Sequence, residues 1–281
     1  MRKIASLLAL LVFFATLSSP ALAAKKKDKP GWEGWDRWNV DVGVFSAKQD
    51  TVLRLDATDG TVGTEIDFEN NLNLDAREET PRIDVLWRYK KRSSLSLNYF
   101  KLEREGVGPL SVTLRWGDVV FDPVSTSSVR SKYDIEVISA QWGYTFFRTR
   151  KWDARFTLGI FAMDIFAAIQ DPADPVSSDQ GDVLAPLPVI GMGFDHKLTG
   201  KWHLQGRFNY FNIEAEDEYK GTLTETNINA THHTFKNVGF GIGYSAMNLD
   251  VDSTDKDFSG FLNIKYKGPF AYVRVRLRPG G

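Results

Sequence analysis

The sequence contains no cysteine, so disulfide bonds, thiol nucleophiles and thiolate metal sites are all excluded. It has only four histidines, the side chain that most often acts as a general base or a neutral metal ligand near neutral pH. After the first 23 residues it also lacks any apolar run of the length that a membrane-spanning helix needs. Stability and function must therefore come from other residue types.

An excess of charge of either sign is absent as well. The chain carries 35 basic and 36 acidic residues. Without residues 1–23, which contain Arg2 and Lys3, there remain 33 basic and 36 acidic residues, a formal charge of −3. This composition offers no basic surface for phosphates, so we expect no nucleic-acid partner.

The first residues have the features of an export signal. Arg2 and Lys3 supply a positive start, an apolar run follows at residues 4–16, and Ala21 and Ala23 form a small-x-small cleavage site. We predict a signal peptide at residues 1–23 and a periplasmic lead-in at residues 24–36. Residues 37–281 are expected to form a single domain.

Apolar and polar residues alternate with a period of two through most of the remaining chain, which indicates strands. In the clearest case, residues 202–210, Trp202, Leu204, Phe208 and Tyr210 alternate with polar side chains. Mean hydropathy is nevertheless only −0.28, although 13% of the residues are aromatic. A transmembrane barrel has this character, because its apolar residues form an outer band and its lumen is polar.

A β-sandwich would show the same alternation, with its apolar faces buried between two sheets. The aromatic residues argue against a sandwich because they gather at the predicted strand ends, as at Trp32, Trp35, Trp38, Trp152 and Trp202. Aromatic rings prefer the headgroup level of a membrane. The sequence therefore predicts an all-β fold, a closed antiparallel transmembrane β-barrel.

The number of strands follows from the alternating segments. Ten crossings are expected, at residues 37–48, 82–90, 94–103, 133–147, 152–169, 184–196, 201–213, 226–235, 238–248 and in the C-terminal segment. Residues 52–57 and 64–68 form either two further crossings or an extension of the first hairpin. We favour twelve strands, with ten as the alternative.

The predicted connections fall into two classes. Those at residues 90–93, 148–151, 197–201 and 236–237 are short and basic, whereas those at residues 171–182, 214–225 and 250–257 are longer and polar or acidic. In outer-membrane barrels the short turns are periplasmic and the long loops extracellular. In the last segment the apolar residues change from even to odd positions at Gly268–Pro269, which predicts a bulge there.

Several segments resemble a known class of protein. They are Thr64 to Leu72, Trp87-Arg88-Tyr89, Pro186 to Gly191, Asn237 to Tyr244, and Tyr266 to Pro269. These segments are similar to those of uncharacterised outer-membrane β-barrel proteins of Gram-negative bacteria. The resemblance covers essentially the whole chain after the signal peptide. It implies a barrel in the bacterial outer membrane, but no substrate and no catalytic residues.

The few candidate residues for chemistry favour structural interpretations. His203 should point into the lumen, and His196 should lie at the membrane interface. His232 and His233 are neighbours on a strand, so they should face opposite ways and not share a metal ion. The acidic segment 171–182 lacks the spacing of a calcium loop. We therefore predict no catalytic, metal or cofactor-binding residues, and no cofactor.

The inward-facing positions of the predicted strands collect charged residues of both signs. The candidate lumen-lining residues are Arg82, Asp84, Arg88, Arg207, Arg274 and Arg276. Their charges either pair into a rigid plug or line a narrow hydrophilic channel.

These residues suggest a structural role or a channel for small solutes. The alternatives are a lipid-modifying hydrolase of the outer membrane and a surface-binding protein that uses acidic extracellular loops. The expected partners are outer-membrane lipids and the barrel-insertion machinery, and the expected state is a monomer.

Overall fold

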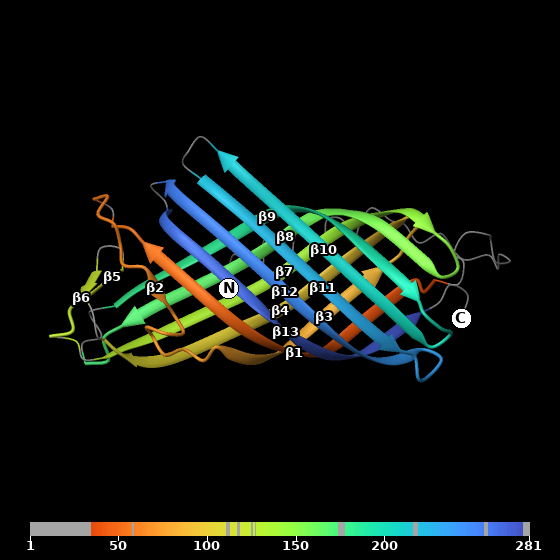
Figure 1. Ribbon diagram of the computed structural model, residues 1–281, viewed down its shortest axis with the longest axis horizontal. Helices are drawn as coiled ribbons and strands as arrows, with labels where there is room; N and C mark the ends of the chain where they lie inside the picture. Colours follow the sequence, from red (N-terminus) through yellow and green to blue (C-terminus); the bar gives the residue numbers. More distant parts are fainter. Residues whose placement is uncertain are drawn as a thin grey trace, which may run out of the picture. The chain divides into compact units, whose positions relative to one another are not determined.

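Ten long antiparallel strands form a closed ring in the described part of the chain (Figure 1). This computed structural model describes residues 35–57, 59–110, 113–116, 119–124, 126, 128–173, 178–215, 219–255 and 258–277. The predicted signal peptide and the predicted lead-in up to residue 34 lie outside these ranges. No helix within them is long and apolar enough to cross a membrane.

The ring follows the order of the chain. Its strands are β1 (Trp38–Leu55), β3 (Arg77–Trp87), β4 (Ser93–Pro109), β7 (Ser128–Arg148), β8 (Trp152–Gln170), β9 (Ser178–Lys197), β10 (Trp202–Ala215), β11 (Tyr219–His232), β12 (Val238–Asp255) and β13 (Phe258–Leu277). The short strands β2 (Ile66–Asp67), β5 (Leu114–Trp116) and β6 (Val119–Phe121) lie outside the ring. β1 pairs with both β3 and β13, so closure leaves the first and last strands without a free edge.

The predicted closed antiparallel β-barrel is confirmed, but the favoured count of twelve strands is corrected to ten in the described residues. Residues 52–55 continue β1, and the two residues of β2 pair alongside Leu53 and Val52 without crossing the ring. Both segments therefore extend the first hairpin, which is the second arrangement that the sequence allows. They are too short to span a membrane, which takes about 9–11 residues per strand.

The two ends of the barrel differ in their connections. Residues 88–92, 149–151, 198–201 and 233–237 connect strands at one end, here called the short-turn end. The opposite end, the loop end, carries β2, β5 and β6 (Figure 1). The predicted acidic loops are mostly strand, because β10 and β11 pair as far as Ala215 and Tyr219, and β12 and β13 as far as Asp255 and Phe258.

Polar and apolar side chains exchange faces about halfway along the strands. In the half nearest the short turns the exterior is apolar, with half-exposed side chains that include Phe156, Leu158, Ile160, Phe208 and Ile242. In the half nearest the loops the exterior is charged, with exposed side chains that include Lys48, Asp50, Glu79, Glu103 and Lys265. The interior does the reverse, being polar in the first half and apolar in the second. Such an arrangement fits lipid around the first half and water around the second.

Strand β13 illustrates this exchange and corrects the predicted bulge at Gly268–Pro269. Its pairing with β1 keeps one offset from Phe45↔Phe270 to Lys48↔Lys267, and its pairing with β12 runs unshifted through the same residues. Even-numbered side chains therefore face the interior on both sides of Gly268. The apolar residues move from even to odd positions because the medium around the strand changes. The direction in which even and odd side chains point does not change.

Residues 66–75, here called the plug, fold over the apolar part of the interior at the loop end. The Phe68 ring lies 4.9 Å from the Tyr133 ring of β7 and 6.1 Å from the Trp116 ring of β5, measured between centroids. Gly108 of β4 permits the close approach of the plug backbone, since a Cβ atom there would lie 2.8 Å from the carbonyl carbon of Leu72. The plug thus completes an apolar core that the strands alone leave open.

A register shift in β7 adds to the aromatic exterior. The shift lies between Thr145 and Phe147 in the pairing with β8. It leaves Phe146 and Phe147 41% and 49% exposed, so two consecutive rings face outward, and Phe146 stacks on Phe156 at 4.5 Å. This bulge lies near the short-turn end, where an aromatic girdle is expected to meet lipid headgroups.

Candidate functional site in the barrel interior

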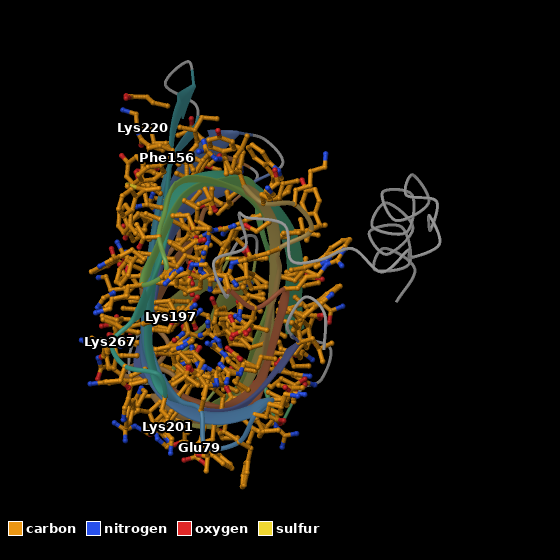
Figure 2. The ribbon with its side chains drawn as sticks, turned by 90° about the vertical axis from the view of Figure 1, so that its right-hand side faces the viewer. Glu79, Phe156, Lys197, Lys201, Lys220 and Lys267 are labelled. Carbon is orange, nitrogen blue, oxygen red and sulfur yellow. The ribbon has the colours of Figure 1, made fainter. Side chains whose placement is uncertain are left out.

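The structure places the six candidate lumen-lining residues on the inner side of the ring, in its polar half. Arg82, Arg88, Arg274 and Arg276 are 1–4% exposed, and the side chains of Asp84 and Arg207 are 22% and 18% exposed. Each of the five arginines has a carboxylate within 3.6 Å. In an end-on view the ring encloses side chains with many nitrogen and oxygen atoms (Figure 2).

One group of charges centres on Asp84 of β3. Arg82 donates to its two oxygens at 2.8 and 3.2 Å, and Asn98 of β4 donates at 2.9 Å. Arg207 of β10 approaches the same carboxylate to 3.6 Å and that of Glu225 to 3.5 Å. Because β3 and β10 are not neighbours in the ring, the contact between Arg207 and Asp84 crosses the interior.

A second group centres on Asp195 of β9, nearer the short-turn end. Arg155 of β8 lies 2.5 Å and Arg88 lies 3.0 Å from the same carboxylate oxygen, and Gln205 donates to the other one. Arg88 follows β3, which lies across the ring from β9. This group therefore joins opposite walls of the barrel, as Arg207 and Asp84 do nearer the loop end.

Arg82 marks the boundary between the polar and apolar halves of the interior. One side of its guanidinium contacts Asp84, while its central carbon lies 4.7 Å from the centroid of the Phe270 ring, 5.6 Å from Phe45 and 5.7 Å from Phe100. Aromatic faces attract a cation at such distances. The arginine is thus held by charge on one side and by aromatic rings on the other.

Space remains among these charges. A cavity of about 70 Å³ is bounded by Asp41, Asp84, Arg155, Arg207 and Arg274, among others. A water molecule needs about 10–15 Å³ on the same measure, so the cavity has room for a few waters. A polar chamber of this size suits hydration of the buried charges.

The loop end of the interior is closed by a different kind of contact. Arg104 of β4 donates to Oγ1 of Thr51 at 2.9 Å and also contacts the carboxylate of Glu69 in the plug. Its guanidinium lies 5.2 Å from the centroid of the Tyr133 ring. One buried arginine therefore fastens the plug to two strands.

The short-turn end is covered by the last residues of the predicted lead-in. Trp35 is 2% exposed and donates its indole N–H to the carbonyl of Thr149 at 2.8 Å. The ammonium of Lys197 lies 4.0 Å from the centroid of the Trp35 ring. Arg88 donates to the carbonyl of Asp36 at 3.1 Å, which anchors the chain where it enters β1.

All four histidines lie at the short-turn end. His196 stacks on Trp152 with ring centroids 3.8 Å apart, and His232 lies 5.0 Å from Trp202, both on the outer side. His203 and His233 are 8% and 3% exposed, and His233 Nε2 lies 3.2 Å from His203 Nδ1. His232 and His233 do face opposite ways, but the inward one meets a third histidine from the adjacent strand.

The acidic residues of this interior that are not among the candidates from the sequence include Glu225, Asp195 and Asp36. The sequence places Glu225 in an acidic loop, yet it is 2% exposed and accepts a hydrogen bond from Asn209 at 2.5 Å. Asp195 and Asp36 complete the set, the latter from the predicted lead-in. The alternation in β9 and β11 could have identified Asp195 and Glu225, since both lie at odd-numbered positions, as do the small or polar inward residues of the same strands. Nothing in the sequence pairs Asp36 with the histidines.

Comparisons with known proteins agree with this architecture. No protein-family model matches the sequence, and no curated protein is detectably similar to it. Among solved structures, the outer membrane protease OmpT from Escherichia coli matches with a TM-score of 0.56 and 10% identity, over 91% of this chain and 100% of that one. The attachment invasion locus protein Ail of Yersinia pestis matches with a TM-score of 0.36 and 7% identity, over 85% and 98% of the two chains.

At 10% identity the likeness to OmpT concerns the fold alone. It agrees with the closed ring, the apolar exterior band and the segments that resemble outer-membrane barrels. The chain therefore has the fold of the β-barrel proteins of the bacterial outer membrane, and its apolar band marks the part that lies in that membrane.

Proposed function

We propose that the protein is a closed, structural barrel of the outer membrane that holds a rigid extension above the membrane on the extracellular side. The observation that carries this proposal is that ion pairs join opposite walls of the polar half of the interior. Arg88 contacts Asp195 at 3.0 Å, and Arg207 approaches Asp84 to 3.6 Å. Ion pairs of this kind resist separation, because a buried charge that has lost its partner strongly destabilises the protein.

The apolar half of the interior supports the same role. Phe45, Phe100 and Tyr266 pack edge to face with ring centroids 5.3–5.8 Å apart, and they belong to the same buried apolar core as Phe68 and Leu72 of the plug. A solute would have to displace this core as well as the ion pairs. The charged exterior of the same half suits a surface that stands in water.

A narrow channel for small solutes is the second candidate. The observation that favours it is the polar cavity of about 70 Å³ between Asp41, Asp84 and Arg207. To conduct, the barrel would need to release the plug and part at least one pair of charges that crosses the interior. The channel thus requires a rearrangement that the structural role does not.

A catalytic role and a surface-binding role have less support. OmpT is a protease, but a likeness of 10% identity carries no activity over to this chain. A hydrolase that relied on histidine at the extracellular side would lack that base, since all four histidines lie at the short-turn end. Binding through acidic loops has less support because residues 219–225 and 250–255, which the sequence assigns to such loops, are strand.

Planar-bilayer recordings test the proposal. Purified wild-type protein is expected to insert without producing discrete conductance steps, and so is a variant in which residues 64–75 are replaced by a short Gly-Ser linker. Discrete steps from wild type, with an ion selectivity that changes in the double variant Arg207→Gln/Arg274→Gln, would overturn the structural role and establish the channel.

A further inference from the structure

Two histidines and one aspartate meet inside the short-turn end, apart from the ion pairs described above. Asp36 belongs to the segment that leads into β1, His203 is the second residue of β10, and His233 follows β11. One nitrogen of each histidine and one carboxylate oxygen of Asp36 lie within 4.8 Å of one another. The three residues are 3–8% exposed.

The spacing of the two histidines suits a shared metal ion. His233 Nε2 and His203 Nδ1 are 3.2 Å apart. Zinc binds histidine nitrogen at about 2.0–2.1 Å in tetrahedral geometry, which puts two such ligands about 3.3 Å apart. The observed separation therefore needs little adjustment to hold an ion between the rings.

The strand register fixes both histidines in this arrangement. His203 pairs with Thr231 on the inner face of β10 and β11, and the backbone N–H of His233 donates to the carbonyl of Lys201 at 2.8 Å. Gly239 of β12 makes room for the second ring, since a Cβ atom there would lie 2.9 Å from His233 Nδ1. His203 thus lies within a strand, and His233 is the first residue of the turn that follows β11, held there by the hydrogen bond to Lys201.

The third ligand is held from the other side. The carbonyl of Asp36 accepts from Arg88 at 3.1 Å, and its neighbour Trp35 packs edge-on against His203 with centroids 6.5 Å apart. Arg276 lies 3.6 Å from Oδ2 of Asp36. An outer partner of this kind orients a carboxylate that binds a metal through one oxygen.

We propose that Asp36, His203 and His233 form a binding site for a divalent transition-metal ion, with Zn²⁺ as the expected occupant. Two imidazole nitrogens and one carboxylate oxygen make a ligand set that zinc accepts, with water as the fourth ligand. The ion fastens the segment before β1 to the ends of β10 and β11. The site does not depend on whether the barrel conducts.

The competing explanation is a hydrogen bond between two neutral histidines, with no ion. The two explanations differ in what added metal does. A hydrogen-bonded pair gains nothing from zinc, whereas a site with three ligands binds one ion and is stabilised by it through binding to the folded state alone.

The experiment uses the full chain without a histidine tag, folded in detergent, treated with chelator and dialysed. ZnCl₂ is titrated calorimetrically, and CoCl₂ serves as a spectroscopic probe because tetrahedral Co²⁺ absorbs visible light far more strongly than the hydrated ion. Wild type is expected to bind about one ion per chain, to gain the tetrahedral cobalt spectrum and to unfold at a higher temperature with zinc.

The matched variants are His203→Gln, His233→Gln and Asp36→Asn, with His232→Gln as the control because its ring lies outside the barrel. The first three should weaken zinc binding by more than the roughly 10–100-fold that loss of an outer partner causes, whereas the control should bind like wild type. The mobility shift between heated and unheated samples on gels reports folding of each variant.

If a histidine variant does not fold, the cobalt spectrum of wild type and the Asp36→Asn titration still decide the question. Wild type that binds no zinc and leaves cobalt hydrated would overturn the site in favour of the hydrogen bond. Equal loss of binding in His203→Gln and His232→Gln would overturn it too, because zinc would then be bound elsewhere.

Discussion

Arg274 of β13 and Asp41 of β1 face each other across the seam that closes the barrel. They are register partners, and Nε and Nη2 of the arginine donate to the two carboxylate oxygens at 2.6 and 2.5 Å. Both side chains are at most 10% exposed. The pair therefore joins the first and last ring strands through a side-chain contact as well as through the backbone ladder.

We expect the two partners of this seam to be interdependent. Arg274→Gln or Asp41→Asn alone should lower the free energy of unfolding by about 3–5 kcal/mol, because each leaves a buried charge unpaired, and the double variant should lose less than the sum. Denaturant unfolding in phospholipid vesicles measures all four proteins. Strictly additive losses would contradict the coupling.

The exchange of faces along β13 predicts that two substitutions on its exterior differ in cost. Val273, 41% exposed in the apolar band, should lose about 2–4 kcal/mol on replacement by Lys, since the charge would enter lipid. Lys265→Val, on the same face beyond the band, should cost much less. Folding titrations in bilayers compare them, and a gain in stability from Lys265→Val as large as the loss from Val273→Lys would show that lipid covers both positions.

Close contact at Gly108 predicts that the plug can be displaced without unfolding the barrel. Gly108→Val should expel residues 66–75, because a Cβ atom would already lie 2.8 Å from the backbone of Leu72. Limited proteolysis should then cut the plug faster, while the gel shift on heating persists. Gly181→Ala is the control, since nothing lies within 4 Å of a Cβ atom there.

The apolar exterior band predicts the location of the protein in the cell. The chain should fractionate with the outer membrane and migrate faster on gels when it is not heated. Recovery from the periplasm without detergent would contradict the assignment of the band to lipid.

Much of the fold followed from alternation, because period two reports a strand whatever surrounds it. All ten expected crossings correspond to ring strands. Alternation reports two faces but not which medium each face meets. At Gly268–Pro269 the sequence pattern therefore predicted a change of face where only the medium around the strand changes. For the same reason the acidic segments 214–225 and 250–257 were predicted to be loops, although residues 219–225 and 250–255 are strand.

The candidate site was predictable only where the alternation within a single strand was enough to assign a residue to the interior. The arginines could be assigned to the lumen one strand at a time, since each alternates with apolar neighbours. The partners Arg88 and Asp195 are 107 residues apart, and their contact depends on which strands face each other across the ring. The meeting of Asp36 with His203 and His233 likewise needs the register of β10 with β11.

The paired lysines of the seam have a consequence for the thickness of the membrane that can hold this barrel. Lys48 and Lys267 are register partners on the exterior, and the apolar exterior of β13 ends just below them at Ala271. At about 3.4 Å per residue, the six steps from Leu277 to Ala271 measure about 20 Å along the strand, and tilt makes the band shorter still across the membrane, below the roughly 25 Å that is usual in outer-membrane barrels. A thicker bilayer would submerge both ammonium groups, so it would have to thin around the barrel to avoid hydrophobic mismatch.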